Sequence, residues 1–316
     1  MRRVALIYNP ASGQHSLRRR RAIDKALDVL RSAGVEAEAL ETLAPGSAGA
    51  QAAEAVRRGC DTIIACGGDG TVHEVLQSMV GSSAALGVVP LGTANALAAN
   101  LSLSFSPTKA VRKLLTAHPE SFPVGRITYR DANGVSSSRY FTVAAGVGAD
   151  ALFLSRLNPS LKRRLGYLLY LIEGFRVWAT HSFPLYKAAF VEQKGGAPRV
   201  EEISQLLAVR IRDFGGVLNH FVPGATLHNG GLRLVAFKTR SRFRYFRFLL
   251  GAICGRPAFS NQIEVLNALS VECSPLNGVS PRVYAEADGE LLGQLPVRIE
   301  IVPQAVNLLV PPGARP

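Results

Sequence analysis

The chain has 316 residues and a formal net charge of +13, and 47% of its residues are hydrophobic. This apolar content is sufficient for a packed core and excludes a disordered chain. The excess of positive charge predicts anionic partners such as nucleotide phosphates, nucleic acid or an acidic membrane surface.

The first third of the chain alternates predicted strands with predicted helices. Apolar runs predict strands at Val4–Tyr8, Val35–Leu40, Thr62–Cys66 and Ala85–Val89. Helical spacing between and after them predicts helices at Leu17–Ala33, Ala48–Arg58, Val72–Val80 and Ala94–Leu101. This alternation with short loops predicts a parallel sheet that helices cover on both faces.

After about residue 120 the pattern changes to short strand-like segments that Gly, Asn and Pro turns separate. These segments are Arg126–Arg130, Tyr140–Ala145, Leu185–Val191, Leu206–Arg212, Leu232–Lys238, Ile263–Glu272, Arg282–Glu286 and Pro296–Val302. Helical stretches interrupt them at Leu161–Ala179 and Arg242–Cys254. We predict two domains, residues 1–122 and 123–316, the second an antiparallel sandwich or barrel, and allow for a last strand that returns to the first domain.

No segment of the sequence predicts a membrane span or a signal peptide. The apolar run at Val4–Tyr8 is too short for a signal peptide, and no run of about 18 apolar residues occurs. The four cysteines, Cys60, Cys66, Cys254 and Cys273, lack CxxC spacing, which argues against a zinc site or a disulfide framework. The expected compartment is a reducing cytosol.

A glycine-rich loop follows the third predicted strand and precedes a helix: Gly67, Gly68, Asp69, Gly70 and Thr71. Glycines allow close backbone approach to a phosphate, and a helix N-terminus offers free N–H groups. Since a carboxylate repels phosphates, Asp69 implies a cation or a transferable proton. The alternative is a purely structural turn.

Two further loops follow neighbouring strands. Pro90–Asn95 (PLGTAN) contains Gly92, which permits close approach, and Thr93, which offers a hydroxyl or serves as a simple N-cap. Asn9–Gly13 (NPASG) follows the first strand. Ligands of open α/β sheets bind at the carboxyl ends of the strands, so three such loops predict a phosphate site at one edge.

Together these motifs resemble the catalytic domain of the diacylglycerol kinase family, which includes bacterial lipid kinases, sphingosine kinases and ceramide kinases. The resemblance extends through Tyr140–Phe141, Gly146–Asp150, Leu161–Tyr167 and Asp288–Glu290, and so spans nearly the whole chain. It implies an α/β fold with a Rossmann-like N-terminal domain that binds ATP, a C-terminal antiparallel β-sandwich domain that binds lipid, and a cleft between them.

The resemblance also implies the reaction and the residues that perform it. The chain is expected to transfer the γ-phosphoryl group of ATP to the hydroxyl of diacylglycerol, a sphingoid base or a related lipid. The phosphates would lie against Gly67, Gly68, Asp69, Gly70 and Thr71. Further nucleotide contacts are implied for Asn9, Ser12, Thr42 and Thr93. Mg²⁺ is expected as the ATP complex, helped by Asp69.

Asp288 and Glu290 are the expected acids of the lipid domain. Phosphoryl transfer to an alcohol needs a base for the hydroxyl proton, and the resemblance assigns that part to Glu290, with Asp288 beside it. In an extended segment the two carboxylates would share a face, and in a turn they would converge. The alternative is an ordinary acidic hairpin turn, which Asp-Gly favours.

Three positions depart from the family pattern by lacking an acid: Ala96, Pro123 and Gly230. In many bacterial members carboxylates stand there, and the Gly230 segment holds a structural metal ion. Because Mg²⁺ requires acidic oxygens, we predict that the accessory metal network is absent and that no structural Mg²⁺ is bound at Gly230. The apolar Ala96 resembles sphingosine kinases, which favours a sphingoid or atypical lipid and leaves open a catalytically weak member.

Basic residues alternate with aromatic ones in Phe237–Arg256 and in Lys162–Trp178. This pattern suits a helix at an anionic membrane surface, or alternatively a helix with a solvated basic face. A nucleic-acid partner is disfavoured because no recognised binding motif occurs. We expect a cytoplasmic protein that binds the inner face of the membrane peripherally.

Two rival functions share parts of the pattern. NAD kinase-like and phosphofructokinase-like enzymes also carry a Gly-Gly-Asp-Gly loop, but no motif for reading a sugar or dinucleotide is evident in the second half. A non-catalytic nucleotide- and membrane-binding protein would explain the lost acids, although Asp69, Thr93 and Glu290 are retained. Neither the acceptor lipid nor the oligomeric state follows from the sequence.

Overall fold

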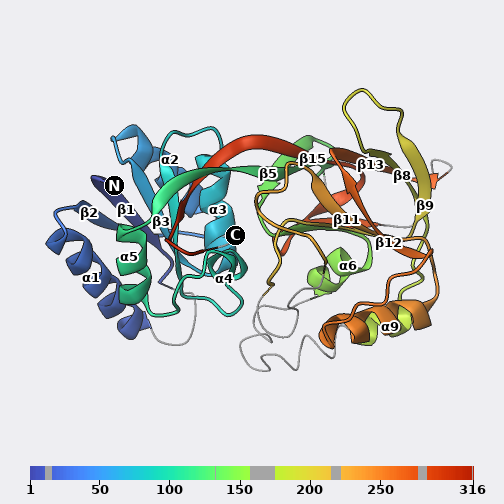
Figure 1. The fold of residues 1–316 in the computed structure, drawn as a ribbon, viewed down its shortest axis with the longest axis horizontal. Helices are drawn as coiled ribbons and strands as arrows, with labels where there is room; N and C mark the ends of the chain where they lie inside the picture. Colours follow the sequence, from blue (N-terminus) through green and yellow to red (C-terminus); the bar gives the residue numbers. More distant parts are fainter. Residues whose placement is uncertain (11–15, 132, 157–174, 215–221, 277–282, 315) are drawn as a thin grey trace.

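The computed structural model describes residues 1–10, 16–131, 133–156, 175–214, 222–276, 283–314 and 316. Figure 1 shows two halves side by side, one built from the first third of the chain and the other from the later strands. Two long strands, β5 (His118–Arg130) and β15 (Glu290–Val310), run through both halves and pair with each other.

The first half is a parallel sheet covered by helices, as the sequence predicts. Its elements are β1 (Arg3–Tyr8), α1 (Ser16–Ser32), β2 (Glu36–Glu41), α2 (Ser47–Arg57), β3 (Thr62–Gly67), α3 (Asp69–Met79), β4 (Ala85–Pro90), α4 (Ala96–Asn100) and α5 (Pro107–Leu115). The strands lie in the order β4-β3-β1-β2 and pair in parallel. Helix α1 packs against α5 and α2 against α3, so both faces are covered and β3 and β4 are buried throughout.

Two details of this half differ from the prediction. Helix α3 begins at Asp69 and not at Val72, so the last three residues of the glycine-rich loop form its first turn. Helix α5 was not predicted, although Pro107 stands at its start and its apolar spacing buries one face. The earlier start of α3 places its free N–H groups directly within the predicted phosphate loop.

The second half is built from antiparallel strands, which confirms the predicted fold class. Its elements are β6 (Ser136–Phe141), β7 (Ala144–Val147), α6 (Ala149–Arg156), β8 (Tyr186–Val191), β9 (Arg199–Ile203), β10 (Gln205–Val209), β11 (Leu232–Phe237), α9 (Arg242–Ile253), β12 (Ile263–Ala268), β13 (Ser270–Ser274) and β14 (Tyr284–Ala287). Strand β7 lies between β10 and β14, and β11 between β10 and β12. None of the helices in the described ranges has the length and apolarity to cross a membrane.

Several predicted strands of this half are divided or longer than expected. The predicted strand Tyr140–Ala145 is interrupted at Thr142 and Val143, because their N–H groups donate to a side chain and not to a neighbouring strand. The predicted strand Ile263–Glu272 is interrupted at Leu269 and forms β12 and β13, which have different partners. Strand β9 and helix α6 were not predicted, and most of the predicted helix Leu161–Ala179 lies outside the described residues.

The last strand joins the two halves. The predicted strand Pro296–Val302 is only the middle of β15, which pairs antiparallel with β13, β14 and β5. Further along, Asn307 and Leu308 pair in parallel with β4, and this end belongs to the buried core of the first half. The predicted boundary at 122/123 falls within β5. The division into two domains and the cleft between them stay predictions.

Candidate active site

The loops that follow β3 and β4 lie against each other at the carboxyl edge of the parallel sheet. The backbone N–H of Leu91 donates to the carbonyl of Gly67 at 2.8 Å. A Cβ atom at Gly92 would lie 2.5 Å from the Cα of Gly68, so no side chain fits there. Because β1 and β2 pair in parallel with the same sheet, the residues that follow them lie at this edge too. The loops that follow β3 and β4 therefore converge as predicted, whereas residues 11–13 of the Asn9–Gly13 loop lie outside the described residues.

The carboxylate of Asp69 connects the two glycine-containing loops. Its Oδ2 accepts the N–H of Asn95 at 2.9 Å, and its Oδ1 accepts the N–H of Ala96 at 2.8 Å. Burial raises the pKa of Asp69, and these N–H bonds act in the opposite direction. The side chain therefore holds the start of α4 in place through groups that a helix N-terminus leaves unpaired.

Asn95 closes the PLGTAN turn and stands at the N-cap position of α4, without a capping bond from its side chain to the helix. Its side chain accepts the N–H of Gly92 and donates to the carbonyl of the same residue, both at 2.9 Å. It adopts the left-handed conformation with φ of 50°, which Asn tolerates better than most residues. The alternative reading of Thr93 as the N-cap is wrong, since Thr93 precedes the cap and is exposed to solvent.

The remaining predicted nucleotide residues occupy different environments. Thr71 is buried and packs against Gly67, where an added Cβ would collide with its side chain. Thr42 follows β2, is partly exposed, and donates its N–H to the carbonyl of Tyr8 at 2.9 Å. Asn9 follows β1 and is partly exposed. Ser12 lies outside the described residues.

The Asp288–Glu290 motif forms the tight turn between β14 and β15. Asp288 and Gly289 have positive φ angles of 47° and 88°. The carboxylate of Asp288 accepts three backbone N–H groups at 2.9–3.0 Å, from Thr142, Val143 and Ala144. Its side chain is only 4% exposed. Asp288 is thus fixed between β6, β7 and the turn. The backbone of this motif forms the hairpin turn that the sequence analysis gave as the alternative.

Glu290 differs from Asp288 in being exposed and in lying near Gly70 of the glycine-rich loop. Its Oε1 lies 3.5 Å from the position that a Cβ at Gly70 would occupy. The two residues are 220 positions apart in the chain, and only the passage of β15 beside the first half brings them together. An accessible carboxylate therefore stands directly at the N-terminal turn of α3.

Two polar residues of α3 that the sequence analysis did not assign to the site hold this arrangement together. The Nδ1 of His73 lies 3.4 Å from Oδ2 of Asp288, and both side chains are buried. The Gln77 amide donates to the carbonyl of Tyr140 and accepts its N–H, both at 2.9 Å. Helix α3 is thereby attached to β6 and to the Asp288 turn. No local sequence signal could reveal these pairs, because their partners are far apart in the chain.

Glu286 supports the same turn from the other side. It is 6% exposed, and its Oε2 accepts the N–H of Gly289 at 3.0 Å. Burial, followed by the nearby charge of Asp150, raises the pKa of Glu286 well above its usual range. Burial likewise raises the pKa of Asp150 to about 6. The carboxylate of Asp150 occupies the space that a side chain at Gly146 would fill. Gly146 pairs with Glu286 across the sheet, so the carboxyl groups of Asp150 and Glu286 are neighbours close to the turn that carries Glu290.

Comparisons with known proteins agree along the whole chain. Residues 3–127 match the diacylglycerol kinase catalytic domain, and residues 142–310 match the YegS C-terminal NAD kinase beta sandwich-like domain. The chain is 26% identical over 314 residues to a diacylglycerol kinase of Bacillus subtilis, covering 98% of this chain and 97% of that one. It is 25% identical over 313 residues to a diacylglycerol kinase of Staphylococcus saprophyticus, covering 98% and 96%.

The fold is also similar to a solved structure. A crystal structure described as a diacylglycerol kinase from Bacillus anthracis Sterne superposes with a TM-score of 0.68 at 18% identity. The match covers 99% of this chain and 98% of that chain. At this identity the likeness concerns the fold, and it includes both halves.

Proposed function

The chain belongs to the family that joins a diacylglycerol kinase catalytic domain to a YegS-type C-terminal domain, and from this premise we propose that it is an ATP-dependent lipid kinase. The acceptor would be the hydroxyl of diacylglycerol, a sphingoid base or a related lipid. The observation that supports this most is the position of Glu290, whose carboxylate lies beside Gly70 at the first turn of α3.

The phosphates of ATP are assigned to the edge where the glycine loops meet. Gly67, Gly68 and Gly70 allow close approach, and the first turn of α3 offers unpaired N–H groups and a positive dipole end. Asp69 positions the start of α4 at this edge by accepting the N–H groups of Asn95 and Ala96. When bound, the Mg²⁺ of the ATP complex would neutralise phosphate charge. No group of ligating side chains for a further metal occurs among the described residues.

The remaining predicted nucleotide residues would contact ATP around this edge. They are Asn9, Ser12, Thr42 and Thr93. Thr93 is exposed to solvent whereas Thr71 is buried, so we assign direct contact with ATP to Thr93 and loop packing to Thr71.

Glu290 is the proposed base. The lipid hydroxyl oxygen forms a bond to the γ-phosphorus while its proton passes to the carboxylate of Glu290. The bond from the γ-phosphorus to the bridging oxygen breaks, and ADP leaves. Asp288 cannot easily share this part, because three N–H groups already occupy its buried carboxylate. We assign to Asp288 the positioning of the turn that presents Glu290.

Transfer of labelled phosphate tests this function directly. The purified protein is incubated with γ-labelled ATP, Mg²⁺ and a total lipid extract, and in parallel with NAD. We expect label in a lipid fraction and none in NAD. Label in NAD alone would favour the NAD kinase-like alternative. Nucleotide binding without any transfer would favour a catalytically inactive, nucleotide-binding member.

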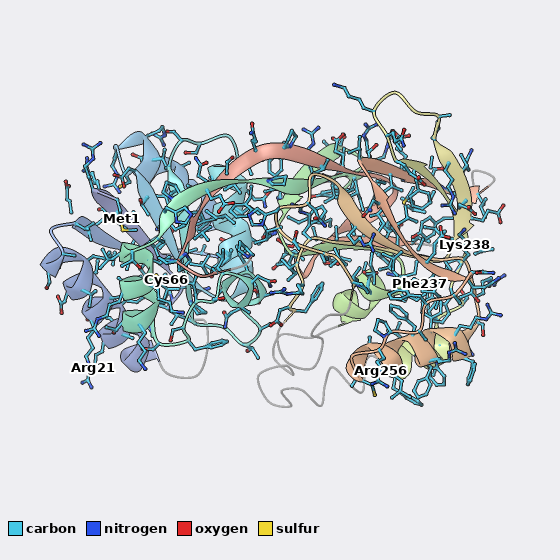
Figure 2. All side chains as sticks on the ribbon, in the orientation of Figure 1. Met1, Arg21, Cys66, Phe237, Lys238 and Arg256 are labelled. Atoms are coloured by element: carbon cyan, nitrogen blue, oxygen red, sulfur yellow. The ribbon has the colours of Figure 1, made fainter. Side chains whose placement is uncertain are left out.

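Helix α9 is the proposed membrane contact, since it has two apolar faces. Its inner face packs on the sheet, where Phe237 lies 4.7 Å from the ring of Tyr245 and 4.9 Å from that of Phe248. Figure 2 shows Phe237 and Arg256 near this helix, at the far end from Met1. The outer face exposes large apolar side chains: Phe243, Phe246, Leu249, Leu250 and Ile253. These five form the outer apolar face.

The charges around α9 suit an anionic lipid surface. Of the twelve large apolar side chains exposed in the described part of the chain, five lie on this one helix. The segment Phe237–Arg256 contains six basic residues and no acid. Lys238 is paired with Glu201 and Glu264, which leaves the arginines as the cationic rim. Apolar side chains with a cationic rim are typical of helices that lie in the membrane interface.

Vesicle binding tests the outer apolar face. A double variant, Phe243→Ser with Leu250→Ser, should bind vesicles of phosphatidylcholine and phosphatidylglycerol at least about tenfold more weakly than the unchanged protein. Added salt should weaken the binding of the unchanged protein. Co-sedimentation measures both effects. Leu43→Ser is the matched control, because Leu43 is 86% exposed but belongs to the first half. Equal binding by the double variant and the control would contradict the assignment.

A further inference from the structure

Arg210 carries a positive charge in the interior of the molecule. It follows β10, and its side chain is 0% exposed. Its Nη1 donates to the carbonyls of Asn229 at 2.8 Å and Gly231 at 3.1 Å. Its Nη2 donates to the carbonyls of Leu227 at 2.7 Å and Pro123 at 2.9 Å. Four backbone oxygens from two separate segments thus surround one cation.

The neutralisation of this charge comes from carbonyl dipoles. Burial lowers the pKa of Arg210 to about 10, so the guanidinium remains charged at neutral pH. No described carboxylate forms an ion pair with it. Backbone carbonyls are among the oxygen ligands that hold cations in proteins, usually together with carboxylates.

The carbonyls come from the segments in which the chain lacks the acids of its family. Pro123 stands at one such position and contributes an oxygen directly. Gly230 stands at another, between Asn229 and Gly231, and a Cβ added there would meet nothing within 4 Å. Because these residues supply no carboxylate, they do not fit the structural metal ion that the family pattern implies.

We propose that the guanidinium of Arg210 replaces this structural metal ion and fastens the 227–231 loop to β5. A divalent ion loses much hydration energy on binding and needs carboxylates to offset that loss. The monovalent guanidinium of Arg210 is instead held by four carbonyls through Nη1 and Nη2, and its buried Nε has no hydrogen-bond partner among the described residues. The planar group donates in two directions at once, which lets it hold two segments together. The inference rests on these contacts and on family membership, and it does not depend on lipid kinase activity.

The same segment connects this internal cation to the phosphate edge. Oδ1 of Asn100, at the end of α4, accepts the N–H groups of Arg212 and Asp213 at 3.2 Å. Its amide donates to the carbonyl of Asp213 at 2.6 Å and to that of Ala96 at 2.8 Å. Ala96 is the third position at which the chain lacks the acid of the family pattern, and its N–H donates to the carboxylate of Asp69. Arg210 therefore stabilises the segment against which α4 is fixed.

Metal analysis and thermal unfolding test the replacement. The nucleotide-free protein should contain no stoichiometric divalent metal, and its unfolding temperature should be the same in EDTA and in millimolar Mg²⁺. Arg210→Met introduces an apolar side chain of similar length and leaves four carbonyls without their donor, of which that of Leu227 is buried and the other three are partly buried. We expect its unfolding temperature to fall by roughly 5 °C or more, with a smaller fall for Arg210→Lys.

Arg233→Met is the matched control. Arg233 also donates to a carbonyl of this region, that of Pro223 at 2.9 Å, but it does so at the solvent-exposed surface. Its variant should unfold near the temperature of the unchanged protein. A stoichiometric metal, a fall in unfolding temperature on EDTA treatment, or equal stability of Arg210→Met and Arg233→Met would overturn the proposal. If Arg210→Met does not fold, the metal analysis and Arg210→Lys decide the question.

Discussion

Replacing Glu290 with Gln should lower the rate of phosphate transfer to lipid by about 100-fold or more, because general base catalysis contributes an effect of that size. The amide keeps the shape of the side chain but cannot accept the hydroxyl proton. Since Glu290 is exposed and reaches only the edge of the Gly70 turn, ATP affinity should be preserved. Steady-state transfer of labelled phosphate and calorimetric titration with ATP measure the two quantities separately.

Glu272→Gln serves as the control for this experiment. Glu272 is an exposed carboxylate on β13, where it pairs with Arg298 at the surface, away from the loops of the phosphate edge. Its variant should transfer phosphate at the unchanged rate. Equal turnover of Glu290→Gln and the unchanged protein would refute the base assignment, even if lipid kinase activity itself were established.

Replacing Gly92 with Ala should lower kcat/KM for ATP by about 100-fold, since displacements of about 1 Å in a site can have effects of that size. The added Cβ would stand 2.5 Å from the Cα of Gly68. Because the colliding atom is backbone, the two loops must separate, and Asn95 could no longer close the turn as it does. ATP titration and initial rates at varied ATP concentration measure the change.

Gly230→Ala is the matched control for the glycine substitution. A Cβ at Gly230 would meet nothing within 4 Å, so this variant should bind ATP and unfold as the unchanged protein does. Gly92→Ala should also keep most of its secondary structure, because the change affects a surface edge of the sheet. Unchanged ATP kinetics in Gly92→Ala would show that the nucleotide does not bind where the two loops meet.

The sequence by itself determined the class of fold and the position of the glycine-rich loops. Strand–loop–helix patterns are local, so apolar periodicity was enough to predict β1 to β4 and the glycine turns that follow them. Parallel pairing then required those loops to share one edge of the sheet. The motif at Asp288–Glu290 was also visible, although two readings of it remained open.

Only the tertiary structure distinguished the environments of Asp288 and Glu290 and revealed the buried cation at Arg210. Asp288 is occupied by three N–H groups of a segment about 145 residues earlier in the chain, whereas Glu290 stands open beside Gly70. Arg210 looks like any basic residue after an apolar strand until the carbonyls of Pro123 and the 227–231 loop surround it. These features depend on contacts between distant segments, which residue periodicity does not encode, because periodicity records which face is buried and not which partner covers it.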